Sequence, residues 1–524
     1  MPITQQGALN TAALVVPDLY VQIVPPQSLA LNGVPTDRIG LVGTASWGPV
    51  NRPVVVGSLA QYQIAFGPVI ARGFDLGTPL ACAQLQGAQD FVAVRVTDGT
   101  DVAATYALLY STSTSSYPVQ LIAVNTGSRG NQISVALATG SRSGTWKLTL
   151  QMPGQLAEVF DNIDASQGNP AFWSALVSAV NNGTGATRGP SALCVAAAGS
   201  ALTTAPVAFS GQTLLTGTDG ASGATPATLV GTDGLARTGM YALRGQGCAL
   251  AVLADASDPA QWSVQAAFGL SEGVYMILVS ASGDTISGAM ESKATAGLDS
   301  YAAKLMFGDW LDWYDESNAQ TRLVSPQGFA AGVLAALSPE QSSLNKRISG
   351  VIGSQKSGLA SSGAALTYSS AELETLIGAG IDVICNPAPG GAYWAVRSGH
   401  NTSSNGVIDG DAYTRMTNFL AETLAAGMGS YVGAVINATL LSNVRATLLG
   451  TLGNLLTQGI LGSVDGSIPY AVVCDASNNP QARTALGYVQ ADVQVRYQGI
   501  NEKFIVNLQG GASVTISTAS GNGA

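Results

Sequence analysis

The stretch Arg38-Ile39-Gly40-Leu41-Val42-Gly43 decides the class of fold. It is short, mostly apolar and interrupted by glycine, and Phe91-Val92-Ala93-Val94 further along the chain has the same apolar character. Runs of this kind are typical of strands that are buried on both faces of a sheet. A helix is expected between Pro79 and Gln86, in the interval that separates the two strands. Strand, helix and strand in this order predict the opening of an α/β domain.

The same pattern returns after residue 248. Apolar runs at 249–253 and 274–279 predict two strands, with a helical segment around 259–268 between them. Farther on, Ser369 and Glu372 have the spacing of a capping box, which predicts a helix ahead of the strand at 381–384. This alternation of strands and helices predicts a mainly parallel sheet covered by helices.

Residues 98–215, between these two halves, have a different character. Turns rich in serine and threonine separate short runs that alternate apolar and polar residues, such as 132–137 and 145–150. Alternation with period two predicts strands that have one buried face. We therefore expect a small β-sandwich inserted into the α/β domain, and a return linker rich in glycine and threonine at 211–234.

Two long helices and a sheet are expected in the C-terminal part. Apolar side chains recur on one face of each helix, which predicts a buried stripe. Residues 489–497 alternate in period two and predict a strand with one buried face, and residues 503–508 predict a second strand. The two helical stripes consist of Tyr413, Met416, Leu420 and Leu424, and of Val444, Leu448, Leu452, Leu455 and Leu456.

Both ends of the chain carry detached segments with strand propensity. Residues 20–24 precede Pro25 and Pro26, which prevent the strand from continuing. Residues 512–517 form a similar segment near the other end. Strand-forming arms without a partner usually join the sheet edge of another molecule. The pair of arms therefore predicts a protein that assembles.

The composition narrows the possible functions. Only 10% of the 524 residues are charged, where about 25% is usual, and the net charge is -10. The sequence contains no run of lysine or arginine that would predict contact with nucleic acid. It also contains no stretch of about 18 apolar residues that would predict insertion into a membrane. The five cysteines are expected to be buried and reduced, in a chain made in a cytosol. So little charge suggests a surface covered by copies of the chain or by a partner.

No residue is expected to catalyse a reaction or to bind a cofactor or a metal. His400, the only histidine, lies in a polar loop and is expected to be exposed, and no G-x-S-x-G motif supplies a nucleophile for it. No Gly-Lys dipeptide is present, which excludes a P-loop. The acidic set Asp309, Asp312, Asp315 and Glu316 could hold a cation, but a solvated acidic edge anchored by neighbouring aromatic residues is the favoured interpretation.

A set of short motifs runs in order along nearly the whole chain. Each motif is weak alone, but the ordered set is specific. The motifs are LYVQI at 19–23, VPTDRIGLVGTASWGPVNRP at 34–53, FG at 66–67, DFVAVRV at 90–96, WLDWYD at 310–315, VSPQG at 324–328, AGV at 331–333, GIDVI at 380–384, VCD at 473–475, NP at 479–480 and FIV at 504–506. With this set the chain resembles the contractile bacteriophage tail sheath proteins of the myovirus type. It departs from the family's pattern at 347–350 and at 499–502.

The resemblance implies a multidomain fold of class α/β plus β. A subtilisin-like α/β middle domain carries an inserted β-sandwich that faces outward, an α+β C-terminal domain lies against a tail tube, and extended arms link subunits. The implied boundaries are 1–27 for the N-terminal linking arm, 28–97 and 216–398 for the two parts of the α/β domain, 98–215 for the β-sandwich, 399–508 for the tube-proximal domain and 509–524 for the C-terminal linking arm.

The resemblance also implies a structural role and no enzymatic one. Sheath subunits form hexameric rings stacked helically around the tail tube, and the rings contract to drive the tube through the host envelope for genome ejection. The implied partners are copies of the chain, the tail tube protein, the baseplate and the tail terminator or neck proteins. The chain would be part of a virion assembled in the host cytoplasm, without nucleotide or cofactor. A tailocin or another contractile injection system is an alternative, and an α/β hydrolase that uses His400 is a distant one.

Individual residues receive roles through the same resemblance. Arg415 and Arg445, among the few cations of the C-terminal helices, are expected to contact the tube. The donated linking strands would contain Tyr20, Val21, Gln22, Ile23, Val24, Val514, Thr515 and Ile516, and the receiving sheet would contain Val489, Val493, Val495, Phe504 and Val506.

Overall fold

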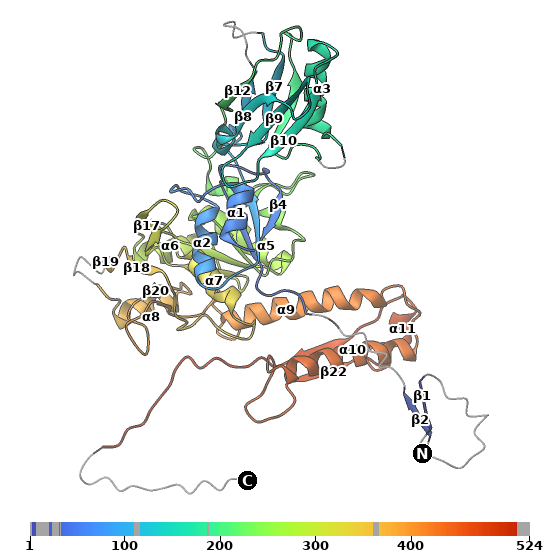
Figure 1. Cartoon of the computed structure of the whole chain (residues 1–524). Helices are drawn as coiled ribbons and strands as arrows, with labels where there is room; N and C mark the ends of the chain where they lie inside the picture. The colour runs from blue at the N-terminus through green and yellow to red at the C-terminus, as the bar shows by residue number, and fades with distance from the viewer. Residues whose placement is uncertain are drawn as a thin grey trace.

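The computed structural model describes residues 3–6, 20–23, 31, 33–108, 116–185, 188–359 and 366–510. Three bodies follow one another along an elongated molecule (Figure 1). An inserted β domain lies at one end, an α/β body in the middle, and two long helices with a small sheet at the other end. Within the described ranges, no helix combines the length and the apolar character that crossing a bilayer requires.

The middle body is built on a six-stranded sheet in the order β15-β14-β13-β3-β5-β4. Neighbouring strands are parallel, except that the edge strand β4 runs antiparallel to β5. The five parallel strands are buried along their whole length, as expected for a sheet covered on both faces. The strands are β3 (Ile39–Gly43), β4 (Pro53–Val56), β5 (Phe91–Arg95), β13 (Leu250–Leu253), β14 (Tyr275–Val279) and β15 (Ala303–Met306).

Helices cover both faces of this sheet and complete two hydrophobic cores. The predicted capping box is present, because Ser369 and Glu372 each bond the other's backbone N–H at the start of α8. One face packs against α1 (Leu59–Phe66), α2 (Gly77–Leu85) and α7 (Gln327–Ala336). The other face packs against α4 (Pro226–Val230), η3 (Gly239–Leu243), α5 (Trp262–Glu272), α6 (Ile286–Thr295) and α8 (Ser370–Gly378).

A second, smaller sheet lies beside the first and has the order β17-β16-β18-β19. A short antiparallel pair, β20 with β21, follows it in the chain. The bounds are β16 (Leu311–Asp315), β17 (Gln320–Val324), β18 (Val351–Ser354), β19 (Gly358–Leu359), β20 (Ile384–Cys385) and β21 (Ala395–Val396).

Helices α2 and α7 approach each other so closely that only glycine fits at their crossing. A Cβ atom added to Gly332 would lie 2.6 Å from the Cα atom of Ala83, and one added to Gly328 would lie 2.8 Å from the Cα atom of Pro79. Backbone atoms cannot move aside as a flexible side chain can. These contacts give a physical reason for the glycines of the 324–333 motifs.

We expect Gly332→Ala to destabilise the protein by about 2 kcal/mol, because the added methyl group forces α2 and α7 apart. Alanine favours a helix more than glycine does, so intrinsic propensity alone would give the opposite sign. The matched control is Gly378→Ala at the end of α8, where no atom lies within 4 Å of the added Cβ. Urea denaturation of both variants measures the difference, and equal stabilities would contradict the close crossing.

The inserted domain consists of two sheets and one helix around a single hydrophobic core. The sheets have the orders β10-β9-β8-β12 and β11-β7-β6, and α3 packs on β10 and β11. The sequence predicted the strands but not α3, and its expected linker at 211–234 is wrong in part, because β12 and α4 occupy some of it. The bounds are β6 (Ala103–Ala107), β7 (Val119–Thr126), β8 (Ser134–Thr139), β9 (Thr145–Gln151), β10 (Glu158–Asp164), α3 (Asn169–Asn182), β11 (Cys194–Ala198) and β12 (Phe209–Thr213).

Buried contacts attach the inserted domain rigidly to the middle body. Arg95 at the end of β5 donates to the carbonyl oxygens of Gly48 (2.8 Å), Thr126 (2.7 Å) and Asp219 (3.1 Å). Gly48 belongs to the middle body, Thr126 to the inserted domain, and Asp219 to the segment that leads back from the inserted domain. Trp47 of the middle body packs in the core of the inserted domain. A rotation of one body against the other would have to break these contacts.

The C-terminal body has its own core between two helices and a two-stranded sheet. Both predicted helices are confirmed, and the helical stripes around Met416 and Leu448 face this core. The elements are α9 (Asp411–Met428), α10 (Ala438–Thr457), β22 (Tyr470–Val473), α11 (Gln481–Thr484) and β23 (Asp492–Val495).

The sheet of this body differs from the predicted one. Strand β23 is shorter than 489–497 and pairs antiparallel with β22, which the sequence did not predict. The side chain of Asn479 bonds the backbone N–H and C=O of Gln490, so it closes the loop that brings β22 alongside β23. Val493 and Val495 pack against the core, whereas Val489 lies outside the strand and is exposed.

The expected second strand at 503–508 is wrong. Residues 498–510, called here the terminal segment, have no strand or helix, and the predicted receiving residues Phe504 and Val506 are exposed. The physical reason is that β22 pairs with one edge of β23, and that Gln498 and Glu502 hold the start of the segment beside Gly459 and His400 instead of beside the other edge. The terminal segment leaves the body instead of folding back on it (Figure 1).

Candidate assembly site

Exposed apolar side chains are concentrated in the terminal segment. The exposed fractions are 82% for Phe504, 82% for Ile505, 68% for Val506 and 88% for Leu508. Single exposed apolar residues are common on protein surfaces, but a contiguous row usually marks a site of interaction. An extended segment also leaves its backbone N–H and C=O groups available for a sheet edge.

Two contacts hold the root of the terminal segment. The side-chain amide of Gln498 donates to the carbonyl oxygens of Gly459 (2.7 Å) and Ile460 (3.1 Å). Nε2 of His400 lies 3.0 Å from Oε1 of Glu502. Residues 498–504 thereby line a groove against the middle body.

The sheet formed by β22 and β23 can accept further strands. Among the described residues each of its strands has one partner, so each has one open edge. A two-stranded sheet is marginally stable by itself and gains from additional strands. The open edges and the exposed terminal segment lie in the same body of the subunit.

The N-terminal segment contains a strand where the sequence predicted one. Strand β2 (Tyr20–Ile23) pairs in parallel with β1 (Ile3–Gln6). Val24 lies outside the described residues, and so do Val514, Thr515 and Ile516. The strand expected near the C-terminal end is therefore untested.

The chain between β2 and the middle body is fixed along helix α9. The backbone N–H of Val34 donates to Oγ1 of Thr423 (3.3 Å). A Cβ atom added to Gly33 would lie 2.9 Å from the ring of Phe419, so the linker and the helix are in close contact. The chain that follows the N-terminal arm is therefore held along α9.

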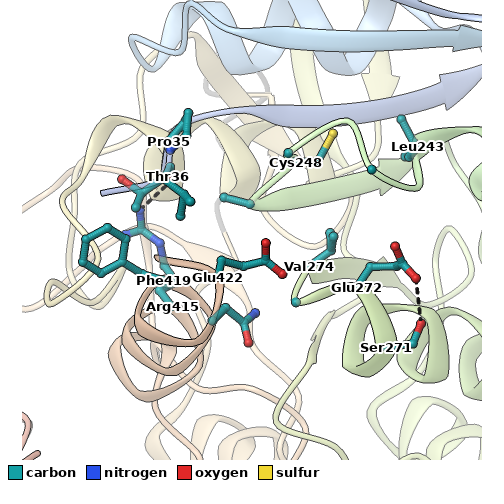
Figure 2. A pocket seen from close by; sticks show the side chains of 16 residues that line it. Pro35, Thr36, Leu243, Cys248, Ser271, Glu272, Val274, Arg415, Phe419 and Glu422 are labelled. Carbon is teal, nitrogen blue, oxygen red and sulfur yellow. Dashed lines mark hydrogen bonds between the residues drawn. The ribbon is translucent and has the colours of Figure 1, made fainter. Parts of the chain in front are cut away.

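Arg415 does not lie on the surface, so its predicted contact with a tube is wrong. Its guanidinium is buried and donates to the carbonyl oxygens of Leu337 (2.7 Å), Ser338 (2.9 Å) and Thr36 (3.3 Å). Burial lowers the pKa of Arg415 to about 10. Figure 2 shows Arg415 reaching the linker beside a cavity of about 220 Å³. The side chain joins the linker, the middle body and α9 rather than a partner. Arg445, in contrast, is exposed on α10.

A buried ionic cluster connects the middle body to the start of α9. Nζ of Lys304 on β15 lies 2.6 Å from Oδ2 of Asp382 and 3.1 Å from Oδ1 of Asp411, and all three side chains are fully buried. Asp411, the first residue of α9, also accepts hydrogen bonds from the hydroxyl groups of Tyr275 (2.6 Å) and Ser343. We call these five residues the joint.

Lys304 and Asp411 stabilise each other's charged forms in the joint. Burial alone would lower the pKa of Lys304, but the two carboxylates outweigh it and raise this pKa. Burial would raise the pKa of Asp411, yet the charge of Lys304 and the hydrogen bonds of Ser343 and Tyr275 lower it. Both directions favour the charged pair, which is typical of a buried cluster with complete hydrogen bonding. The first turn of α9 is therefore fixed to the central sheet.

The acidic set and His400 are placed differently from the sequence predictions. Asp309 and Asp315 are buried, so the expected solvated edge is wrong for these two. Asp315 pairs with Arg322 (2.8 Å). His400 is mostly buried, because Asp409 and Glu502 flank its ring. Within the described ranges, no three His, Cys, Asp or Glu residues are grouped as metal ligands.

One further carboxyl group, Asp75, is buried beside the central sheet. Its Oδ2 accepts hydrogen bonds from the backbone N–H and the hydroxyl of Thr78, both at 2.9 Å, at the start of α2. Burial raises the pKa of Asp75 to about 7, and the hydrogen bonds only partly oppose this. A protonated Asp75 therefore favours the folded state.

We expect the stabilising effect of Asp75 to be lost as the pH rises through about 7. The folded-state pKa lies above the value of about 4 in an unfolded chain, so this stability is complete only at low pH. Asparagine can accept the same hydrogen bonds without a charge. The difference in unfolding free energy between Asp75→Asn and the wild type should therefore change by about 3 kcal/mol, in favour of the variant, when the pH rises from about 5 to about 8. Urea denaturation at both pH values measures this, and a constant difference would refute it.

Solved structures with the same fold are contractile sheath proteins. The sheath tail protein of Desulfitobacterium hafniense is 12% identical with a TM-score of 0.57, over 87% of this chain and 93% of that chain. The sheath tail protein Lin1278 of Listeria innocua is 14% identical with a TM-score of 0.58, over 86% of this chain and 90% of that chain.

A sheath from an injection system is equally similar, and two other comparisons gave no match. The contracted PVC sheath complex of an extracellular contractile injection system is 12% identical with a TM-score of 0.54, over 96% of this chain and 99% of that chain. No protein-family model and no curated protein sequence matches the chain. At these identities the likeness establishes the fold, and the resemblance seen in the sequence is confirmed at that level. The chain has the fold of the contractile tail sheath proteins.

Proposed function

We propose that the chain is the structural subunit of a contractile sheath. One observation carries the proposal: the terminal segment presents four exposed apolar side chains on an extended backbone, and the same body carries a two-stranded sheet with open edges. The terminal segment of one copy of the chain can pair with an open sheet edge of another copy, so the two features fit each other. The shared fold of sheath proteins supports this assignment.

The proposed linking strands differ in part from those expected from the sequence. In the N-terminal arm, Tyr20 to Ile23 of β2 remain the donated residues, and Val24 stays a prediction. Just before the C-terminal arm we add Phe504–Leu508 as a donated strand, and Val514, Thr515 and Ile516 stay predictions. The receiving sheet is β22 with β23, including Val493 and Val495.

The other bodies receive their roles from the same proposal. The middle body has the subtilisin-like arrangement, and the inserted domain is an outward-facing β-sandwich. The C-terminal body faces a tail tube, where Arg445 is exposed and could meet acidic groups. The subunits stack as hexameric rings that associate with a baseplate and with tail terminator proteins.

Contraction requires two alternative arrangements of subunits that stay connected. The joint and Arg95 hold the three bodies of one subunit together. We therefore assign the motion of contraction to the interfaces between subunits, where the arms keep neighbouring subunits connected. The energy comes from better packing in the contracted state, so no nucleotide is needed.

Two settings fit this mechanism: a phage tail assembled in the host cytoplasm and carried in the virion, and a tailocin or another injection system. The PVC sheath complex is named as part of an extracellular contractile injection system. Neighbouring capsid and terminase genes would identify a phage tail. The hydrolase alternative has little support, because the ring nitrogens of His400 contact carboxylates and not a hydroxyl group within the described residues.

Electron microscopy of the purified full chain tests the proposal. We expect hollow helical tubes of stacked rings at high protein concentration. Deletion of residues 1–24 should leave single subunits or isolated rings, because the N-terminal link is removed. A wild-type protein that remains monomeric at all concentrations and salt conditions would contradict the proposed function.

A further inference from the structure

We propose that His400 is a positioning residue that holds the root of the terminal segment, most strongly when its ring carries a proton. The inference rests on the proposed function, because it assigns the segment a role in linking subunits. It goes beyond that function by naming a group that sets how far the linking strand can reach.

The ring of His400 lies between two carboxylates from different parts of the chain. Nε2 is 3.0 Å from Oε1 of Glu502 in the terminal segment, and Nδ1 is 3.7 Å from Oδ2 of Asp409 in the loop before α9. The side chain is 17% exposed. The terminal segment is thus held by a group that belongs to the body of the subunit.

The backbone of His400 is fixed by the joint. Its N–H donates to Oγ of Ser398 (3.2 Å), and its carbonyl oxygen accepts a hydrogen bond from Nζ of Lys304 (3.0 Å). Lys304 in turn contacts the buried carboxylates of Asp382 and Asp411. The ring therefore projects from a rigid support, and its position relative to α9 is defined.

Protonation changes how many carboxylates the ring can hold. A neutral imidazole has one N–H and can donate to Glu502 or to Asp409, whereas the charged ring has two N–H groups and attracts both. Other charged groups line the same groove, namely Glu340, Lys346, Arg397 and Lys503. None of them has a hydrogen bond or ion pair with the ring among the described residues. The two contacting carboxylates dominate, so the charged form binds the segment more tightly.

This contact shortens the reach of the linking strand. From a root at Gln498, ten extended residues place Leu508 within about 35 Å. With Glu502 also held, only six residues remain, and the reach falls to about 20 Å. A strand with the shorter reach can find fewer positions on a neighbouring sheet edge, so the register of the link is better defined.

Limited proteolysis of the full chain within residues 500–506, compared between variants at the same pH, tests the inference, because the cleavage rate follows the fraction of molecules in which the segment has left the groove. At about pH 5.5 we expect these residues to be cleaved about two- to fivefold faster in His400→Gln than in the wild type. At about pH 8.0 the difference should be smaller, because a neutral ring can donate to only one carboxylate at a time. Glu502→Gln should reproduce the His400→Gln result.

A charged replacement separates the role of the proton from that of the ring. His400→Arg keeps a positive charge at both pH values, so its terminal segment should stay protected at about pH 8.0. Lys346→Gln, which changes a groove residue without contact to the ring, is the matched control and should behave as the wild type. Equal cleavage rates of wild type and His400→Gln at the lower pH, or no protection from cleavage in His400→Arg, would overturn the inference.

Tube formation distinguishes this inference from the proposed function. If the wild type forms tubes and the cleavage results are negative, the role of His400 is refuted while the sheath assignment stands. If cleavage follows the prediction but no tubes form under any condition, the anchor is real and the proposed function is refuted.

Discussion

Lys304→Met is expected to lower the unfolding free energy by about 3–5 kcal/mol, because it leaves two buried carboxylates without a counter-charge. Asp382 and Asp411 both contact Nζ of Lys304 and are fully buried. Methionine has a similar volume, so the effect is electrostatic and does not come from a cavity. Urea denaturation of the full chain at neutral pH measures the loss.

The pH dependence identifies the cause of this loss. The pKa of Asp411 is lowered in the native protein mainly by the charge of Lys304. A lowered pKa contributes stability above the unfolded-state pKa, and this contribution disappears as the pH falls. The destabilisation by Lys304→Met should therefore shrink between about pH 7 and about pH 4, where the carboxyl groups can take up protons.

A second lysine provides a matched control. Lys356 pairs with Glu372 at a partly exposed site. Such pairs contribute only about 0–1 kcal/mol, so Lys356→Met should have a small effect. Similar losses in the two variants would show that the joint does not depend on its buried charge.

The sequence predicted the parts of the fold that depend on local patterns. Apolar runs such as 250–253 become buried strands, and the pair Ser369 and Glu372 caps α8 as predicted. These features depend on the spacing of neighbouring residues. The ordered motifs predicted the fold of the contractile sheath proteins, which the solved structures share.

The joint could not be predicted, because its members are distant in sequence. Lys304 meets Asp411 across 107 positions. The one signal was a lysine inside an apolar strand, since β15 reads Ala-Lys-Leu-Met and an unpaired lysine is rarely buried. A search for acidic partners of that lysine would have included Asp382 in the GIDVI motif. The same limit explains Arg415, whose charge suggested a surface role although its contacts lie in two segments that are distant from it in sequence.

The terminal segment shows why a correct strand propensity can give a wrong partner. Phe504 to Val506 have the residue types of a strand, and the sequence therefore placed them in the local sheet. Propensity does not state which edge a strand joins. β22 pairs with one edge of β23, and the segment does not pair with the other edge, which is open among the described residues. The residues that the sequence wrongly assigned to the local sheet are thus the main argument for assembly between subunits.

Replacing Phe504, Val506 and Leu508 together by serine is expected to abolish tube formation. In an extended strand these three alternate residues point to one face, which the neighbouring subunit would cover. Burying each such side chain contributes about 1.5–3 kcal/mol, so each link should lose roughly 5 kcal/mol or more. Sedimentation and electron microscopy should show single subunits at concentrations where the wild type is polymeric.

The matched control removes as many exposed apolar side chains without touching the terminal segment. Leu156, Leu235 and Val464 are almost fully exposed and lie in the three different bodies. Replacing all three of these residues by serine in one variant should leave the tubes intact. Neither triple variant should change the stability of the monomer by more than about 1 kcal/mol, because the replaced side chains are exposed. Tubes of normal length from the Phe504, Val506 and Leu508 variant would refute the assigned linking strand, because an apolar face that can be removed without effect holds no subunits together.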